Sequence, residues 1–540
     1  MKSCFAKSVP LGALVGAVVL GWSAAPGFAQ DSNTTVRSQI DILKQQMSQI
    51  QQQIENLQQQ ELRAEEKANA AAQAAANAVA RMPPPNAPRV TESATHEFGL
   101  SSADGRNTIN LTGVLDLDAG TYFGYSPDKS TIDRRLASGI NARRARIGVT
   151  GLFEGDWAYR LVYDFGGNSD SLNFTNAGAN GNKVSAPALG NTALSGIENA
   201  FITYNGFYTG HAIPIAFDFG IMDVPWTLDE PTGANNIMFL ERSSSQVVAT
   251  EFGGGDSRTA FGARSNNDRY WVGAYITGPQ AGAFHTDEAL TCTTSVSTCT
   301  PTLGQGPQLS FLARGSYQII QNQDGSLHLG VDVGDLFRPR GTNNASTITL
   351  SDRPELRIDP TVFLATPAIA ASGGTVIAAE AAAAWHNAFL QGEYYHYSLD
   401  GIEPTPNFNF NGGYVQASYS FGGKRFYSPA TGAYTGVIPE HPLSFATGGW
   451  GALELAARYS VVDLNDGPAG LTCPSSGTIT AVCGGDQTVY SIGINYYPNL
   501  NMRFMLDYEH AEIDIPSKIG GASTKGTSFD AVAARTQINF

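Results

Sequence analysis

From about residue 98 to the C-terminus, apolar and polar residues alternate in short runs, and this pattern limits the chain to a fold built of β-strands. In residues 502–509 (MRFMLDYE), for example, one face of the predicted strand carries Met, Phe, Leu and Tyr, and the other carries Arg, Asp and Glu. About sixteen such runs follow one another between residues 107 and 540. Charged residues of opposite sign share the polar faces, as in a water-filled interior, whereas a soluble β-sandwich does not need so many inward charges. The sequence therefore predicts an all-β fold, a transmembrane antiparallel β-barrel.

The connections between these runs alternate in length. Short connections are predicted at residues 154–156, 265–268, 321–325 and 497–500. Long connections alternate with them at residues 167–196, 221–256, 278–307 and 463–486. Short turns at one end and long loops at the other are typical of outer-membrane barrels. The pattern is weakest at residues 359–383 and 422–448, where long segments fall where short turns are expected.

The pattern of residues 1–29 predicts that the protein is exported from the cytoplasm. Lys2 and Lys7 precede an apolar run at residues 11–20, and residues 27–29 (GFA) supply small residues at the positions that a signal peptidase reads. This pattern is typical of a cleaved signal peptide. A transmembrane anchor is the weaker interpretation, because the run is short of the roughly 20 apolar residues that span a bilayer.

The charge balance excludes further classes of protein. The chain has 33 basic and 48 acidic residues, and without the two lysines of the signal peptide the balance is 31 minus 48, or −17. Strong binding to nucleic acid is not expected at that charge. No apolar run of helix-spanning length follows the signal peptide, which excludes a helical membrane protein. The last predicted strand ends on Phe540, and such an aromatic terminus resembles the signal by which outer-membrane proteins are recognised for barrel assembly.

A helix is predicted between the signal peptide and the strands. Apolar residues recur there in alternating steps of four and three, at Val36, Ile40, Leu43, Met47, Ile50, Ile54 and Leu57. This is the seam of a heptad repeat, and the alanine-rich stretch to Ala80 can continue the helix. We therefore expect a helical coiled-coil stalk at residues 30–81 and a proline-rich linker at residues 82–97. The barrel is expected over residues 98–540.

Four cysteines follow the predicted signal peptide. Cys292 and Cys299 lie in one loop rich in Thr, Ser and Gly, and Cys473 and Cys483 lie in another. Because an exported protein can oxidise such local pairs, we predict two disulfides, Cys292–Cys299 and Cys473–Cys483. A structural zinc site is the alternative, but spacings of six and nine intervening residues are not typical of one.

Several longer blocks resemble one known family. They are residues 143–167 (RRARIGVTGLFEGDWAYRLVYDFGG), 235–243 (NNIMFLERS), 412–421 (GGYVQASYSF), 451–466 (GALELAARYSVVDLND) and 497–513 (YPNLNMRFMLDYEHAEI). These blocks are similar to the phosphate-selective porin O and P family, and the similarity runs over about residues 98–540. The resemblance implies a trimer of barrels in the outer membrane, each barrel of about sixteen strands and with its own pore.

The resemblance also implies where the pore is narrow. In such barrels the loop after the fifth strand folds into the lumen, and the corresponding stretch here is Gly220–Ser243. The family tends to carry a lysine near the start of this stretch, where this sequence has Asp223. An aspartate reverses the sign of the charge in the throat of the pore. Arg242, in the same stretch, is also expected to line the pore.

Three arginines on neighbouring predicted strands are further pore-lining candidates. Arg144 and Arg146 share the polar face of one strand, and Arg160 lies on that of the next. In one interpretation they form a basic track whose guanidinium groups bind the carboxylate or phosphate oxygens of anionic solutes. In the other they pair across strands with wall aspartates, namely Asp116, Asp118 and Asp164.

No motif for catalysis or for a cofactor competes with a channel. The eight histidines show no metal-ligand spacing, and the sequence has no P-loop, no dinucleotide fingerprint and no nucleophile elbow. We therefore expect no enzyme activity, no cofactor and no metal site.

The predicted function is passive diffusion of small hydrophilic, anionic (phosphate-like) solutes through a homotrimer in outer-membrane lipid, with the stalk in the periplasm. Two alternatives stay open. One is a general diffusion porin without anion preference. The other is a structural protein that tethers the envelope through its stalk and uses the barrel only as a membrane anchor.

Overall fold

The structure is a computed structural model of the whole chain. It describes residues 32–81, 88–92, 98–126, 135–166, 196–208, 210, 213–255, 257–280, 289–292, 299–302, 308–322, 324–339, 346–359, 361–475 and 477–540. The predicted signal peptide and most of the predicted linker lie outside these residues. By their internal contacts the residues form two units, Met1–Pro84 and Pro85–Phe540, which are described separately.

The described residues of the first unit form helix α1 (Ser32–Arg81), which runs through the predicted stalk. From Ile40 onward, the apolar residues of its predicted seam are exposed in the single chain, among them Leu43, Met47 and Leu57. Among the described helices, none is both long and apolar enough to cross a membrane. The helix itself is confirmed, and its assembly into a coiled coil stays a prediction.

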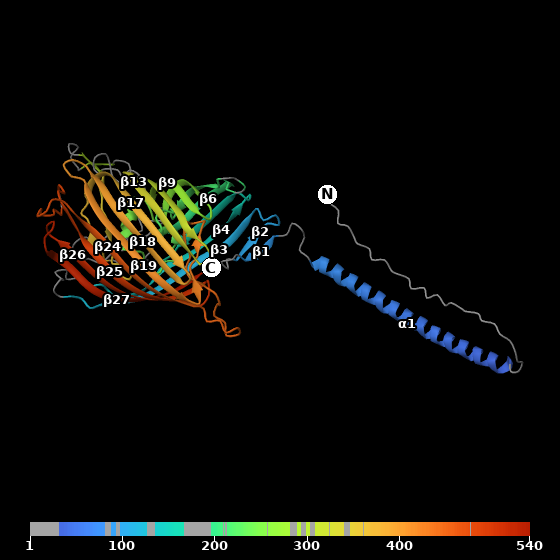
Figure 1. Cartoon of the computed structure of the whole chain (residues 1–540). Helices are drawn as coiled ribbons and strands as arrows, with labels where there is room; N and C mark the ends of the chain where they lie inside the picture. The colour runs from blue at the N-terminus through green and yellow to red at the C-terminus, as the bar shows by residue number, and fades with distance from the viewer. Residues whose placement is uncertain are drawn as a thin grey trace. The chain divides into compact units, whose positions relative to one another are not determined.

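Sixteen antiparallel strands of the second unit close into a barrel, which confirms the predicted fold (Figure 1). In chain order they are β3 (Thr108–Phe123), β4 (Gly139–Phe153), β5 (Trp157–Asp164), β6 (Ile197–Phe207), β7 (Ile215–Met222), β8 (Arg258–Asn266), β9 (Tyr270–Gln280), β12 (Leu309–Gln321), β13 (Gly325–Arg338), β17 (Ile369–Trp385), β18 (Ala388–Gly401), β19 (Phe408–Phe421), β24 (Ala452–Asp466), β25 (Val482–Tyr497), β26 (Met502–Pro516) and β27 (Ser523–Asn539). Strand β27 pairs with β3, and this pairing closes the sheet. The barrel therefore has no free edge at the level of the membrane.

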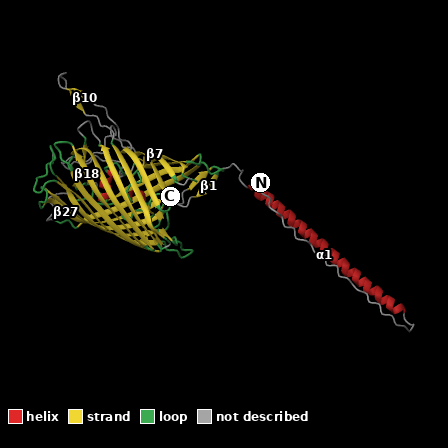
Figure 2. Ribbon diagram, turned by 45° about the horizontal axis from the view of Figure 1, so that its top comes forward, coloured by secondary structure: helices red, strands yellow, loops and turns green. Residues whose placement is uncertain are grey.

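The alternation of the sequence becomes the two faces of the wall. On β26, Phe504 and Leu506 point outward and are exposed, whereas Arg503 and Asp507 point inward and are buried. Figure 2 shows these strands slanting around the barrel. Lipid requires the apolar outward face, and the inward polar face is free to contact loops and water.

The two ends of the barrel differ in the length of their connections. At one end the described turns are short, at residues 154–156, 267–269, 386–387 and 498–501. One segment of this end is long, at residues 422–451 between β19 and β24. The prediction that residues 359–383 also fall at the turn end is wrong, because β17 begins at Ile369 and the residues before it belong to the long-loop end.

Short strands lie beside the barrel or in its connections. The hairpin of β1 (Arg89–Glu92) and β2 (Phe98–Ser101) pairs with the first residues of β3, beyond the point where β27 ends. The other short strands are β10 (Ala289–Cys292), β11 (Cys299–Thr302), β14 (Thr347–Ile348), β15 (Ser351–Asp352), β16 (Leu364–Ala365), β20 (Gly423–Lys424), β21 (Tyr427–Ser428), β22 (Ala433–Tyr434) and β23 (Ile438–Pro439).

Among the connections that the structure describes, three fold into the barrel. The lumen loop (residues 223–257) follows β7, the fifth strand of the barrel, and carries α2 (Asp229–Thr232) and α3 (Ser244–Thr250). The companion loop (residues 346–359 and 361–368) enters from the same end. The turn-side insert (residues 422–451) enters from the other end. Each of the three has buried side chains in contact with inward wall residues.

The hydrophobic core of this unit lies inside the wall. Trp226 and Phe252 of the lumen loop belong to one buried cluster with Tyr397 of β18. The rings of Phe252 and Tyr397 stack, with 5.9 Å between their centroids. On the turn side, Tyr434 of the insert packs against Phe389 at 4.8 Å. Much of the barrel is therefore a packed interior, and water is confined to the remainder.

Candidate pore constriction

The backbone N–H groups of the lumen loop donate to carboxylates of the wall. Leu228 N donates to Glu393 Oε1 of β18 over 2.7 Å. Leu240 N donates to Asp507 Oδ2 of β26 over 2.8 Å. No strand pairs with this part of the loop, so its buried donors need side-chain acceptors, each of which avoids a cost of about 1–3 kcal/mol. The acidic inward residues of the wall supply them.

The carbonyl groups of the same loop accept from wall arginines. Arg503 Nη2 of β26 donates to Ile237 O, and Arg535 Nη1 of β27 donates to Leu240 O, each over 2.6 Å. Arg458 Nη1 of β24 donates to Glu241 O over 2.8 Å. The loop is thus fixed through its main chain, by charge-assisted hydrogen bonds on both its donors and its acceptors.

Arg425 of the turn-side insert connects the insert, the wall and the lumen loop. Its Nε and Nη2 atoms donate to the two carboxylate oxygens of Glu454 over 2.7 and 2.9 Å. Its Nη1 atom donates to Asn236 O of the lumen loop over 2.7 Å. Gly436 N of the insert donates to Asn236 Oδ1 over 2.9 Å. The insert therefore holds the lumen loop from the turn side.

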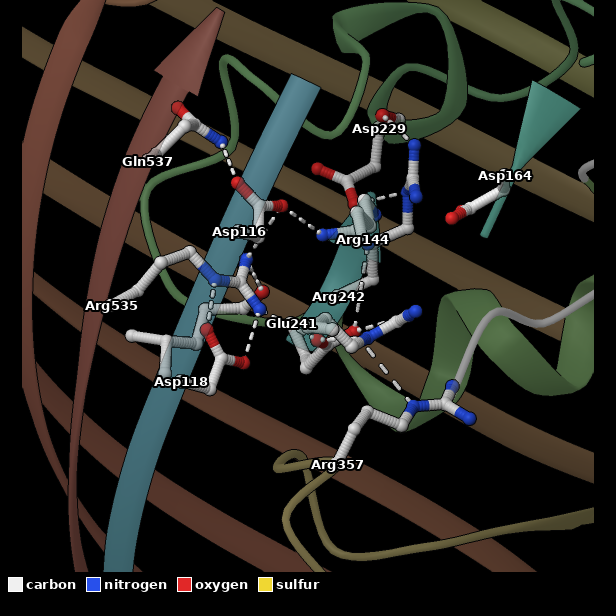
Figure 3. Close-up of polar contacts among 12 residues, drawn as sticks. Asp116, Asp118, Arg144, Asp164, Asp229, Glu241, Arg242, Arg357, Arg535 and Gln537 are labelled. Atoms are coloured by element: carbon white, nitrogen blue, oxygen red, sulfur yellow. Dashed lines mark hydrogen bonds and ion pairs between the residues drawn. The ribbon is translucent and has the colours of Figure 1, made fainter. Parts of the chain in front are cut away.

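Four guanidinium groups contact the carboxylate of Glu241 in the lumen loop, and Figure 3 shows Arg144, Arg357 and Arg535 around it. Arg143 donates to it through Nε over 2.7 Å and through Nη2 over 3.1 Å. Arg535 Nη2 donates to its Oε1 over 3.0 Å. Arg144 Nη2 and Arg357 Nε of the companion loop lie 3.9 and 3.8 Å from its Oε2. This one carboxylate therefore ties both loops to β4 and β27.

A β-bulge brings two consecutive arginines to Glu241. The pairing of β3 with β4 shifts register between Asp116 and Leu117, so that Arg144 is opposite Asp116 and Ala142 is opposite Leu117. Arg143 is the extra residue, and its side chain is fully buried on the inside. Strict alternation from Arg144 would instead have placed Arg143 in the membrane.

Wall aspartates hold the same arginines from the other side. Arg535 pairs with Asp118 through two bonds of 2.7 Å, Nε to Oδ1 and Nη2 to Oδ2. Arg144 Nη1 donates to Asp116 Oδ2 over 3.0 Å. Burial by itself would raise the pKa of Glu241, but the guanidinium groups hold that pKa well below its usual range. The cluster is therefore ionised and closely balanced in charge.

Arg144 and Arg146, two of the predicted pore-lining residues, point inward from β4 and pair with acids of the wall. Arg146 Nε lies 2.9 Å from Asp164 Oδ2, and its Nη2 lies 2.5 Å from Glu198 Oε1. Together with the pair of Arg144 and Asp116, this is the wall-stiffening arrangement. Arg160 points inward from β5, is exposed, and has no ion pair with any residue that the structure describes.

The lumen loop carries two of the predicted pore-lining residues. Arg242 lies beside α2, and Asp223 lies at the end of β7. Arg242 Nε is 3.4 Å from both Asp229 Oδ2 and Glu230 Oε2 of α2. The Arg242 side chain is 10% exposed, against 5% and 3% for the two acids. Asp223 directly follows β7 and is half-buried. Of the five predicted residues, Arg144 belongs to the Glu241 cluster.

On the side formed by β4 to β8, two guanidinium groups, those of Arg146 and Arg264, are more exposed than the aspartates with which they pair. The Arg146 side chain is 11% exposed, against 0% for Asp164. Arg264 Nε of β8 lies 2.9 Å from Asp218 Oδ2, and the two side chains are 22% and 5% exposed. The carboxylates therefore lie behind the cations, and water in this part of the lumen meets the cations first.

The cysteines divide between described and undescribed parts of the chain. Cys473 and Cys483 form a disulfide in the structure. Cys292 and Cys299 are opposite one another in the β10–β11 hairpin, but their side chains lie outside the described residues. The Cys292–Cys299 disulfide stays a prediction.

Several important residues were not singled out from the sequence. Arg264 had a signal, because alternation in residues 258–266 (RTAFGARSN) places both arginines of that run on one face. Arg535 also lies on a predicted polar face. Nothing in the sequence indicated that Arg143 points inward, because a β-bulge does not follow the period of a strand. Glu241 was one loop residue among many, and only its contacts distinguish it.

Replacing Glu241 by Gln keeps the shape of the side chain and removes the charge that the arginines share. The arginines around Glu241 are nearly inaccessible to water, so the substitution leaves buried positive charges without their partner. We therefore expect the free energy of unfolding to fall by roughly 3–5 kcal/mol. The temperature at which the folded barrel unfolds on a heated gel should fall. Glu440→Gln, at an exposed position of the insert, is the matched control. Equal unfolding temperatures for the two variants would contradict a central role for Glu241.

A pH dependence is expected from Asp352 in the companion loop. Arg357 Nη2 lies 3.6 Å from Asp352 Oδ1, yet burial outweighs this contact and raises the pKa of Asp352 to about 6. A raised pKa means that the folded loop favours the neutral acid of Asp352. The folded loop is therefore most stable below about pH 4, where Asp352 is neutral in the folded and the unfolded state, and it loses this stability as the pH rises through 6.

Hydrogen exchange of residues 346–359 measures this effect. Relative to the Asp352→Asn variant, which cannot ionise, exchange in the unchanged protein should accelerate between pH 5 and pH 7. The ratio of the two rates removes the intrinsic pH dependence of exchange. A ratio that stays constant over this range would contradict the prediction.

Comparison with known proteins identifies the family of this chain. The sequence profile of phosphate-selective porin O and P matches residues 109–540. A relative from Caulobacter vibrioides, described as an uncharacterized protein, is 26% identical over 421 residues, which are 75% of this chain and 68% of the relative. Similar solved structures include an anion-selective porin from Comamonas acidovorans (12% identity, 80% of this chain and 100% of that chain, TM-score 0.42) and the outer membrane channel DcaP of Acinetobacter baumannii (12% identity, 80% and 97%, TM-score 0.40). Because the family profile spans most of the chain, this protein belongs to the phosphate-selective porin O and P family.

Proposed function

We propose that this outer-membrane diffusion channel favours small anionic solutes over cations. Membership of a porin family and the closed barrel support the channel. The anion preference is a further step and rests on one observation. On the side of the lumen formed by β4 to β8, the guanidinium groups of Arg146 and Arg264 are more exposed than their acidic partners.

A solute on this side meets hydrogen-bond donors before acceptors. Arg146 and Arg264 reach water while Asp164 and Asp218 stay covered behind them. A guanidinium group presents a planar fork of N–H donors that fits carboxylate and phosphate oxygens. Arg160, which is exposed, adds a cation near the turn end of the same side. The local field therefore favours anions despite the acidic composition of the whole chain.

The Glu241 cluster is not part of the proposed path. Arg143 and Arg144 are almost completely covered, and acids balance their charges. A solute cannot reach these guanidinium groups without displacing the lumen loop. The proposed path therefore passes Arg146, Arg160, Arg264 and Arg242, and the proposed role of Arg144 is to hold the loop.

Reversal potentials in a salt gradient across a planar bilayer test the preference. Arg160→Gln and Arg264→Gln should each lower the ratio of anion to cation permeability. A unit charge at 4 Å in water is worth about 1 kcal/mol, which corresponds to roughly a fivefold change. Asp223→Lys should raise the ratio. Arg63→Gln, the same chemical change in α1, should leave it unchanged.

The outcomes separate this proposal from its alternatives. Equal permeability ratios in all barrel variants would leave a general diffusion porin without anion preference. A well-inserted barrel without stepwise conductance would contradict the channel, and would favour a tethering protein that uses the barrel as an anchor.

We also propose a homotrimer whose stalk lies in the periplasm, after cleavage of a signal peptide at residues 1–29. An even number of strands brings both ends of the barrel out on the short-turn side, which is the periplasmic side in such barrels. The exposed seam of α1, with Leu43 and Leu57 each about six-tenths exposed, needs a partner helix. Three copies of the same stalk would supply it.

Deletion of residues 30–82 tests which part drives assembly. We expect the truncated protein to insert into membranes and to form trimers that resist heating on gels, because the barrel is the larger folded unit. Loss of heat-resistant trimers in a protein that still inserts would show that the stalk drives assembly.

A further inference from the structure

Three buried carboxylates converge on the inner wall beside the start of the lumen loop. Asp332 of β13, Glu380 of β17 and Glu393 of β18 lie on three neighbouring strands. Each offers one carboxylate oxygen, and these oxygens all lie within 4.8 Å of one another. All three residues are buried, with at most 4% of their surface exposed. Three like charges at this spacing need compensation.

The cations beside these carboxylates compensate mainly one of them. Arg314 donates to both oxygens of Glu380 over 3.1–3.3 Å and lies 3.8 Å from Asp332 Oδ1. His328 Nε2 lies 2.8 Å from Glu380 Oε1. Glu393 accepts from neutral donors, which are the backbone N–H groups of Leu228 and Asp229 and the hydroxyl of Tyr414. Asp332 and Glu393 are thus left with incomplete charge compensation among the described residues.

Three oxygens at this place have no hydrogen-bond partner within the described part of the chain. They are Asp332 Oδ2, Thr227 Oγ1 and Tyr395 Oη, all on fully buried residues. Thr227 donates its N–H to Asp332 Oδ1 over 3.2 Å, and Tyr395 follows Glu393 on the inward face of β18. A buried oxygen without a partner costs about 1–3 kcal/mol and points to a bound water or ion.

We propose that Asp332, Glu380 and Glu393 bind a hard divalent cation of the Ca²⁺ type. Ca²⁺ takes six to eight oxygen ligands at about 2.3–2.6 Å, so oxygens on opposite sides of the ion are about 4.8 Å apart. Carboxylates and hydroxyls are the ligands that such an ion prefers. Asp332 Oδ2, which has no hydrogen-bond partner within the described part of the chain, is open to such an ion, and the hydroxyl of Thr227, whose N–H donates to Asp332, is a further donor at this place.

The cation has a mechanical consequence for the pore. The first turn of the lumen loop is docked on two of the proposed ligands, through Thr227 N on Asp332 and Leu228 N on Glu393. An ion that neutralises these carboxylates stabilises the wall to which the loop is bound. Binding of Ca²⁺ therefore strengthens the attachment of the loop at a point distant in sequence from Glu241.

Terbium luminescence tests the site on the full-length protein in detergent. Trp226 directly precedes Thr227, and its Nε1 donates to Val333 O over 3.1 Å, so a Tb³⁺ ion at the site is close to an indole that can sensitise it. After treatment with a chelator, addition of Tb³⁺ should give saturable emission on tryptophan excitation. Ca²⁺ should displace it. Asp332→Asn and Glu393→Gln should each weaken Tb³⁺ binding at least tenfold, about the lower end of the effect of losing a supporting group.

The matched control is Asp507→Asn. Asp507 is also a buried wall carboxylate that accepts a hydrogen bond from the lumen loop, but it lies outside the three ligands. This variant should bind Tb³⁺ as the unchanged protein does. Stepwise bilayer conductance confirms that each variant is folded. Emission that is absent, or equally strong in the Asp332 and Glu393 variants, or equally weakened in the Asp507 variant, would overturn the proposal.

Discussion

The ion-pair cluster of Glu241 is the interaction on which the interior of this barrel depends. A carboxylate carried by a loop is surrounded there by guanidinium groups of β4, β27 and the companion loop. Isolated, each of these ions would oppose burial strongly. Together with Asp116 and Asp118 they form a balanced cluster, and the balance requires the loop to be in place. The position of the loop is thus coupled to the charge of the wall.

Outside this cluster, the charged side chains of the wall also bind the main chain of the lumen loop. The lumen loop carries little regular secondary structure, so its buried N–H and carbonyl groups need other partners. Asp507 and Glu393 accept from its N–H groups, and Arg503 and Arg535 donate to its carbonyls. The inward charges of the strands are therefore largely used to bind the loop, rather than left facing an open pore.

The result is a lumen with two different sides. From β12 to β27 the inward wall is covered by the loops and the turn-side insert, and its charged residues are buried. From β4 to β8 cations such as Arg146 and Arg264 reach water ahead of their acidic partners. The proposed selectivity and the stability of the interior thus involve different arginines of similar sequence context. Arg144 and Arg146, two residues apart, fall into different classes.

The sequence by itself determined the architecture. Period-two alternation, short turns and the terminal aromatic residue predicted the barrel, its closure and the inward direction of Arg144, Arg146 and Arg160. These features are local, because the face on which a strand residue lies depends on its position in the run. The helix of the stalk followed from its period in the same way.

The tertiary structure alone decided which inward residues meet. Glu241 and Arg535 are 294 positions apart in the chain, and no period relates them. The bulge that turns Arg143 inward is a departure from alternation, so alternation cannot predict it. The three carboxylates of Asp332, Glu380 and Glu393 come together because their strands are neighbours in the closed sheet. Periodicity fixes the face of each side chain, and only strand register and loop docking fix its partner.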